Sequence, residues 1–167
     1  MRLQFNLRNS FTSIKFKIKR FLVEITTSKV SPNNLAFGFA LGTFIAILPT
    51  PGFGVLISIF LIYCFKRINA TSILFPFAVW NPLVLAPLYV LSYKIGDILF
   101  EAKTTIGNEY SSLNEVIVFF QTYLVGNVII AIVFSVASYF VIYKVTEIFK
   151  ERKKLRKLRL SKQSIRP

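Results

Sequence analysis

The feature that most restricts the fold is a long central stretch with almost no charge. Between Val30 and Ile95 there is no acidic residue, and the only basic ones are Lys66, Arg67 and Lys94. Across the whole chain 54% of the residues are hydrophobic, and 18 of the 167 are Phe. A soluble domain of this length could not bury so much apolar surface in one core. The sequence therefore predicts an all-α, polytopic membrane protein.

The charge is concentrated at the two ends of the chain, which carries a net charge of +14. Basic residues recur between Arg2 and Lys29 and again between Lys150 and Arg166. Basic segments that flank apolar ones are typical of cytoplasmic loops and tails, and they attract anionic lipids. We therefore predict a bacterial inner (cytoplasmic) membrane protein with both termini in the cytoplasm. Because no aromatic or Gly-rich RNA-binding pattern accompanies the basic residues, nucleic acid is not an expected partner.

The composition also argues against catalysis. The chain has no histidine and a single cysteine, Cys64, so the commonest general base, the commonest metal ligand and the usual nucleophile pairs are missing. No phosphate-binding P-loop motif is present, and the apolar stretch contains no pair of carboxylates for acid–base chemistry. We predict that the protein is not an enzyme and uses no metal or cofactor.

Charge and periodicity divide the chain into three regions. Residues 1–30 are predicted to be a basic amphipathic segment at the membrane interface, because apolar residues from Phe11 to Ile25 follow a 3.6-residue period with lysines beside them. A soluble helix packed on the bundle is the alternative. Residues 31–147 are the membrane domain, which begins at Ser31-Pro32, a typical helix start. Residues 148–167 are a basic cytoplasmic tail, helical at first.

The first apolar run is broken in its middle. Leu35 to Phe65 is interrupted by Pro49-Thr50-Pro51-Gly52, and two prolines with a glycine do not continue a straight helix. Each half is about 20 Å long, shorter than a hydrocarbon core of about 30 Å. The pair is therefore either one long broken helix or a re-entrant hairpin.

The next run has the same design. Ala70–Trp80 and Leu83–Ile95 are separated by Asn81-Pro82, and Pro76 and Pro87 are predicted to add further breaks. Two interrupted segments in corresponding positions indicate a transporter-like binding site.

A polar loop, Gly96–Glu115, is predicted next, followed by a C-terminal transmembrane helix over Val116–Tyr143, with Gly126 as an alternative start of the span. Lys66 and Arg67 would hold both ends of the first pair on the cytoplasmic side. That makes Leu35–Phe65 a re-entrant hairpin, after which Ala70–Ile95 crosses outward and Val116–Tyr143 returns.

The residues singled out for function fall into three groups. The substrate-binding hypothesis rests on the two breaks: Pro49, Thr50, Pro51, Gly52, Asn81 and Pro82. Their backbone N–H groups at helix starts could face an anion, although a surface turn at Pro49–Gly52 and a helix cap at Asn81 are the plainer interpretations.

Gly38, Gly42 and Ala46 form a smooth strip for helix packing, and Lys66 and Arg67 are predicted to contact anionic lipid. Trp80, Tyr89 and Tyr93 are predicted to be interface anchors, with Lys94 snorkelling.

A family resemblance is carried by a set of short motifs along the apolar region. These are Ser31-Pro32, Ala36-x-Gly38, Gly42-x-Phe44, Leu48-Pro49-Thr50-Pro51-Gly52, Asn69, Asn81-Pro82-Leu83, Pro87-x-Tyr89 and Tyr93-x-x-Gly96. Over about Ser31 to Tyr143 the sequence resembles the domain-of-unknown-function 2062 family of small bacterial membrane proteins. Members often carry a polar residue where Gly54 stands and a Thr where Val84 stands, so a contact made there by relatives is lost or changed in this chain.

The resemblance implies a membrane location without a settled activity. Some relatives look to be joined to, or encoded beside, glycosyltransferases of the cell envelope, which implies a link with lipid-carried sugars. Two functions are therefore predicted. The first is handling or translocation of a lipid or lipid-linked anion such as a polyprenyl-phosphate carrier. The alternative is a non-catalytic membrane anchor or partner of a cell-envelope glycosyltransferase. The expected partners are membrane lipids, a second copy of the chain in a homo-oligomer, or that glycosyltransferase.

Overall fold

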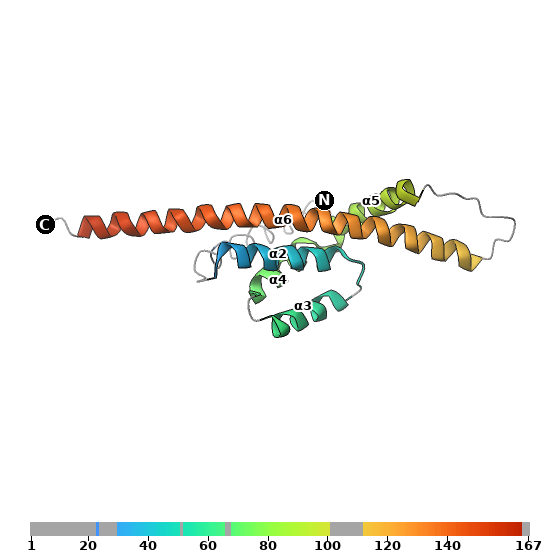
Figure 1. Ribbon diagram of the computed structural model, residues 1–167, viewed down its shortest axis with the longest axis horizontal. Coiled ribbons are helices and arrows are strands. Elements are labelled where there is room, and N and C mark those ends of the chain that lie inside the picture. Colours follow the sequence, from blue (N-terminus) through green and yellow to red (C-terminus); the bar gives the residue numbers. More distant parts are fainter. Residues whose placement is uncertain (1–22, 24–29, 51, 66–67, 101–111, 165–167) are drawn as a thin grey trace, which may run out of the picture.

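The structure is a computed structural model that describes Val23 and residues 30–50, 52–65, 68–100 and 112–164. The helices in these residues are α2 (Pro32–Ile47), α3 (Phe53–Cys64), α4 (Ala70–Val79), α5 (Pro82–Phe100) and α6 (Ser112–Ser164) (Figure 1). The all-α prediction is confirmed for this part of the chain. By length and composition, α5 and α6 are each able to cross a membrane.

The helix starts follow local chemistry. Ser31 Oγ accepts a hydrogen bond from the Asn34 N–H at 3.3 Å, and Pro32 is the first residue of α2, as the sequence predicts. Asn69 caps α4 in the same way, accepting from the Ser72 N–H at 3.1 Å. The chain between α2 and α3 turns at Gly52, whose φ of 80° lies in the left-handed region that favours glycine.

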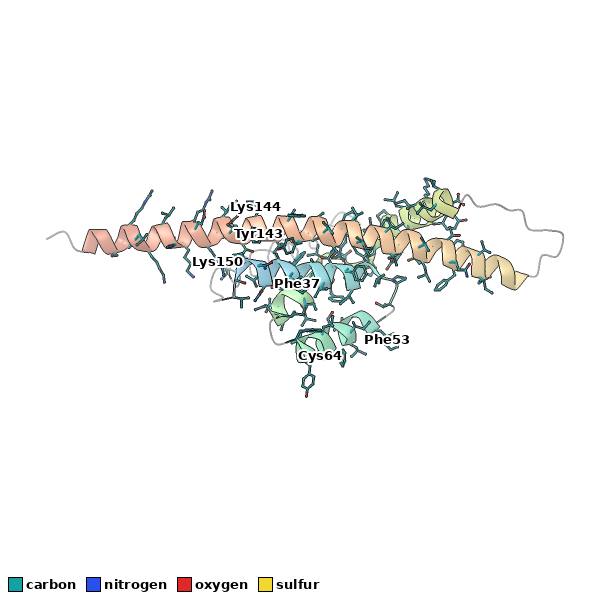
Figure 2. The ribbon with its side chains drawn as sticks, in the orientation of Figure 1. Phe37, Phe53, Cys64, Tyr143, Lys144 and Lys150 are labelled. Atoms are coloured by element: carbon teal, nitrogen blue, oxygen red, sulfur yellow. The ribbon has the colours of Figure 1, made fainter. Side chains whose placement is uncertain are left out.

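Helix α6 is the spine of the molecule, with 53 residues and a length of about 80 Å. Its most extensive contacts are with α2 and α5, and α2 also packs closely against α4. Helix α3 contacts mainly α2 and α4 and lies outermost, with Phe53 and Cys64 marking its ends in Figure 2. The bundle therefore has α2 at its centre and α3 as its least packed element.

Helices α2 and α4 cross closely and run in the same direction. Gly38 lies against Ser72, and a Cβ on Gly38 would be 3.1 Å from the Cβ of Ser72. One turn later the contact is closer still, because a Cβ on Gly42 would collide with the carbonyl oxygen of Ile73 and lie 2.9 Å from Pro76 Cγ. Two predicted packing residues thus lie at the backbone contact between α2 and α4.

A second close crossing joins α5 to α6 in antiparallel orientation. A Cβ on Gly126 would collide with the Ser92 carbonyl oxygen and lie 2.8 Å from the backbone nitrogen of Gly96. Beside this contact, the fully buried Asn127 donates from Nδ2 to Ser92 Oγ at 3.4 Å. The small residues let the backbones meet, and the polar pair links the two helices, as is common in membrane bundles.

Helix α2 and the residue Val30 before it are held to α6 by three hydrogen bonds. Ser135 Oγ donates to the Ala40 carbonyl at 2.8 Å, and Tyr139 OH donates to Asn33 Oδ1 at 2.6 Å. Lys150 Nζ donates to the carbonyl of Val30 and reaches toward the start of α2 in Figure 2. Burial, and then the neighbouring charge of Lys153, lower the pKa of Lys150. The basic end of α6 therefore lies beside the start of α2.

Some expected interruptions are absent. Pro76 and Pro87 lie inside α4 and α5 without ending them. A proline removes one helical hydrogen bond, but the flanking bonds and the packing of neighbouring helices carry the helix past it. Helix α5 also continues to Phe100, beyond the predicted end at Ile95.

The C-terminal helix is longer and more regular than expected. Helix α6 passes through Gly126 and Asn127 without a break and continues to Ser164. By length and composition the candidate membrane span of α6 begins at Val116, and the alternative start near Gly126 stays a prediction. The predicted interfacial segment over Phe11–Ile25 lies, apart from Val23, outside the described residues.

Candidate functional site

The two chain breaks meet at the same height along α6. Ile47 at the end of α2 and Leu85 in the first turns of α5 pack in one cluster with Ile130 and Ala131 of α6. Ile130 lies halfway between Val116 and Tyr143, the ends of the apolar part of the helix. The breaks are therefore beside the middle of that apolar part, about 20 Å from either end.

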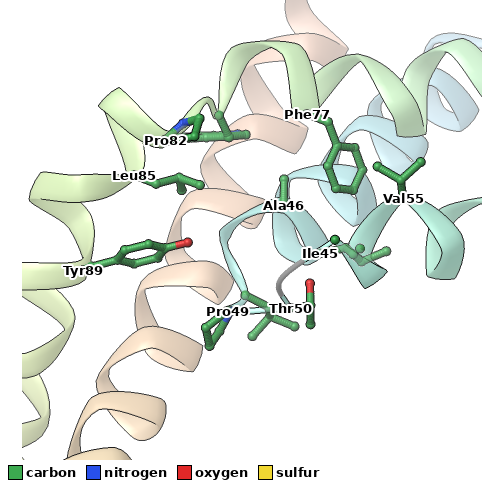
Figure 3. A pocket seen from close by; sticks show the side chains of 13 residues that line it. Ile45, Ala46, Pro49, Thr50, Val55, Phe77, Pro82, Leu85 and Tyr89 are labelled. Carbon is green, nitrogen blue, oxygen red and sulfur yellow. The ribbon is translucent and has the colours of Figure 1, made fainter.

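A cavity of about 480 Å³ lies between these breaks (Figure 3). Pro49, Thr50 and Gly52 line it from the first break, and Trp80 and Pro82 line it from the second. Segments that are distant in sequence thus form one site.

The remaining walls are mainly apolar. Ile45 and Ala46 of α2 and Phe77 of α4 contribute to them, and so does Tyr89 of α5, whose hydroxyl points into the space between α5 and the end of α2 (Figure 3). The hydroxyls of Thr50 and Tyr89 are the polar side-chain groups that line the cavity without a hydrogen bond to another described side chain. None of the described lining residues is charged.

The start of α3 differs from that of α5, the other helix that begins beside the cavity. Gly52 is its N-cap residue, and no described side chain caps the helix. The backbone approaches the cavity wall closely here, because a Cβ on Gly54 would lie 3.0 Å from Phe77 Cε1 and 3.1 Å from Thr50 Oγ1. The first N–H groups of a helix have no partner within the helix and carry partial positive charge. This end of α3 therefore offers backbone donors to the cavity.

The sequence profile of a family described as "Uncharacterized protein conserved in bacteria (DUF2062)" matches residues 16–155. The chain belongs to the DUF2062 family. The resemblance seen in the motifs is thereby confirmed. No curated protein and no solved structure matches the chain.

In this DUF2062 protein, the residues proposed for substrate binding are only partly brought together. Pro49, Thr50, Gly52 and Pro82 line the cavity. Asn81 instead caps α5, with Oδ1 accepting from the Leu83 and Val84 N–H groups at 3.1 Å each. Pro51 lies outside the described residues, as do Lys66 and Arg67, whose predicted lipid contact stays a prediction. Ala46 lines the cavity, unlike Gly38 and Gly42.

The sequence interpretation missed two aromatic residues of the cavity. Trp80, for which the sequence predicts an interface anchor, packs edge-on against Phe134 of α6 with ring centroids 5.3 Å apart. Its indole Nε1 donates to Thr43 Oγ1 at 3.4 Å. Tyr89 lines the same cavity. The spacing of Pro82, Leu85 and Tyr89 at i, i+3 and i+7 places them on one helix face. This spacing was the sequence signal that could have identified Tyr89 as a cavity residue.

Proposed function

We propose that this DUF2062 protein lies in the inner membrane and handles or translocates a lipid-linked anion of the polyprenyl-phosphate class. In this arrangement α2 and α3 form a re-entrant hairpin from the cytoplasmic side. Helices α4 and α5 cross outward as one broken segment, and α6 returns, so both termini are cytoplasmic. The basic end of α6, beside Val30, supports this orientation. The proposed function requires no catalysis by the chain. That the protein is not an enzyme stays a prediction.

The observation that carries the proposal is the shared cavity at the middle of the bundle. Broken helices at membrane depth are tolerated where their free backbone groups face protein or a wet cavity. Here the start of α3 has no described side-chain cap and lies beside the Thr50 hydroxyl, and the Tyr89 hydroxyl lines the same cavity. Helix N-termini that point at anionic groups near the bilayer midplane recur in transporters.

The uncharged lining favours transient binding of the lipid-linked anion over tight binding. A phosphate in an apolar medium is costly unless hydrogen bonds compensate its charge, and this cavity supplies hydroxyls and partial backbone charges but no described cationic side chain. Binding should therefore be weak, which suits a site that has to release its ligand. The apolar walls can accommodate the first isoprene units of the lipid.

The only tryptophan of the chain provides the test. Farnesyl phosphate should change the emission of Trp80 in nanodisc-embedded protein, whereas farnesol should do so at least about tenfold more weakly, because it lacks the charged acceptor. The variants Thr50→Val and Tyr89→Phe each remove one hydroxyl. Each should weaken the response to farnesyl phosphate about threefold to tenfold, the loss of one hydrogen bond.

Tyr63→Phe is the matched control for Tyr89→Phe, because Tyr63 is 86% exposed on α3 and does not line the cavity. Its response should equal that of the unmodified protein. Equal responses to farnesyl phosphate and farnesol in the unmodified protein would contradict a phosphate site in the cavity.

One observation favours the anchoring alternative. Helix α3 exposes Phe53, Leu56, Phe60 and Tyr63, each at 60% or more. This surface could receive a transmembrane helix of an envelope glycosyltransferase or a second copy of the chain. Replacing Phe60 and Leu56 with Ala would then abolish co-purification of a stoichiometric partner, while the farnesyl phosphate response would be unaffected.

A further inference from the structure

A second hollow lies between α5 and α6, on the loop side of the cavity. This aromatic groove has a volume of about 580 Å³, and its lining includes Tyr89, Tyr93 and Lys94 of α5 with Phe119, Phe120 and Tyr123 of α6. The Tyr93 and Phe119 rings stack with centroids 4.9 Å apart, and Tyr89 meets Tyr123 edge-on at 5.8 Å. Ring contacts between the helices thus hold the walls of the groove in place.

The position of the groove along α6 matches the boundary between the hydrocarbon core and the lipid headgroups. Tyr123 and Phe120 lie seven to ten residues before Ile130, which is about 10 to 15 Å along the helix. Half of a hydrocarbon core is about 15 Å. In the membrane placement of the proposed function, the groove therefore reaches from the hydrocarbon to the outer interface, where aromatic residues and lipid phosphates meet.

Among the described residues, Lys94 is the only charged one that lines the groove. Its side chain is exposed, and the salt bridge present among the described residues joins Lys144 to Glu147 instead. Asp97 lies one turn further along α5, but no described carboxylate is within salt-bridge distance of Lys94, so its ammonium group is available to a lipid anion. An apolar groove with one cation at its mouth is complementary to an anionic lipid, which has apolar chains and one negative headgroup.

The groove and the cavity share one wall residue. Tyr89 lines both hollows, on one side with Lys94 and on the other with Trp80. A chain that starts at Lys94 and follows α5 to the level of Leu85 covers about 14 Å. An acyl chain of ordinary length can therefore reach from the mouth of the groove to the wall formed by Trp80.

We propose that the aromatic groove binds one anionic phospholipid of the outer leaflet. Its phosphate lies at Lys94, and one acyl chain follows the groove past Tyr93 and Tyr89 toward Trp80. The site rests on the membrane placement given above but not on passage of a phosphate through the cavity. The bound lipid covers the open side of the α5–α6 pair.

Brominated lipids test this with the full-length protein in nanodiscs. Phosphatidylglycerol brominated on its acyl chain should quench Trp80 more strongly than equally brominated phosphatidylcholine at the same low mole fraction. Lys94→Gln should reduce this preference about fivefold, the factor that one basic side chain near an anionic surface supplies. Lys94→Arg should retain it, and so should Lys144→Gln, a lysine outside the groove.

Equal quenching by the two lipids in the unmodified protein, or an unchanged preference in Lys94→Gln, would overturn the proposal. If Lys94→Gln does not fold, native mass spectrometry of the unmodified protein decides. Retention of one phosphatidylglycerol against excess phosphatidylcholine supports the site, and retention of neither contradicts it. Thr50→Val should leave the lipid preference intact, so failure of the groove and failure of the cavity are distinguishable.

Discussion

Replacing Gly42 with Ala is expected to destabilise the protein by about 3 kcal/mol, the upper part of the usual range for overpacking. The added Cβ would collide with the carbonyl of Ile73 and lie 2.9 Å from Pro76 Cγ. Neither group can move away alone, because one is helix backbone and the other is a ring fixed to it. The two helices would have to separate and lose the packing that holds α4 to α2. Unfolding in mixed micelles, followed by helicity, measures the effect.

Gly38→Ala is the matched control on the same face of α2, one turn earlier. There the added Cβ meets the Cβ of Ser72 at 3.1 Å, a contact that a shift of a few tenths of an ångström relieves. Alanine also favours the helix over glycine by about 1 kcal/mol. Its stability should therefore change by less than about 1 kcal/mol. Equal effects of the two substitutions would contradict the backbone contact at Gly42.

Filling the cavity should stop transport without unfolding the bundle. Ala46 lies on the wall between the two breaks and points into the space that Leu85 and Phe77 border (Figure 3). A phenyl ring from Ala46→Phe would occupy the path that the proposed ligand takes. We expect transfer of a fluorescent polyprenyl phosphate between the leaflets of proteoliposomes to fall at least about tenfold, since relieving such overpacking costs 1 to 3 kcal/mol.

Ala86→Phe adds the same ring at an exposed position of α5 that does not line the cavity. It should transport at the rate of the unmodified protein. The helicity of both variants should match that protein, which separates a blocked path from a damaged fold. Normal transfer by Ala46→Phe would mean that the cavity is not the path.

The local structure was largely predictable from the sequence because it depends on a few strong signals. Ser31-Pro32 set the start of α2, and Pro49 with Gly52 set the break before α3. Those signals act through the backbone itself, by capping, by a missing donor or by a positive φ. Pro76 was misleading for the opposite reason. Its effect depends on packing against α2, which the sequence does not display.

The composition of the site was harder to predict because it depends on how the helices cross. The two breaks share a cavity because α2 crosses α4 at Gly42, and because Ile47 of α2 and Trp80, which follows α4, pack in one cluster with Ile130 of α6. The sequence predicted Pro49, Thr50 and Gly52 but gave no measure of their distance from Pro82. The usual preference of tryptophan predicts an interface position for Trp80, and only the crossing of the helices shows that it packs in the cluster around Ile130.

The central claim is that α2 and α3 enter and leave the membrane on the same side, so that their break lies at the middle of the bilayer. Cys64 is the only cysteine of the chain and is exposed at the end of α3. Ser31→Cys in a Cys64→Ser background reports on the start of α2, and Thr50→Cys in that background reports on the break.

A membrane-impermeant maleimide applied to spheroplasts and to inside-out vesicles gives the most direct measurement. We predict that native Cys64 and Ser31→Cys react only in inside-out vesicles, and that Thr50→Cys reacts in neither preparation. Reaction of Ser31→Cys and Cys64 from opposite sides would show that α2 and α3 cross the membrane together. That result would contradict the re-entrant hairpin and move the candidate site away from the bilayer midplane.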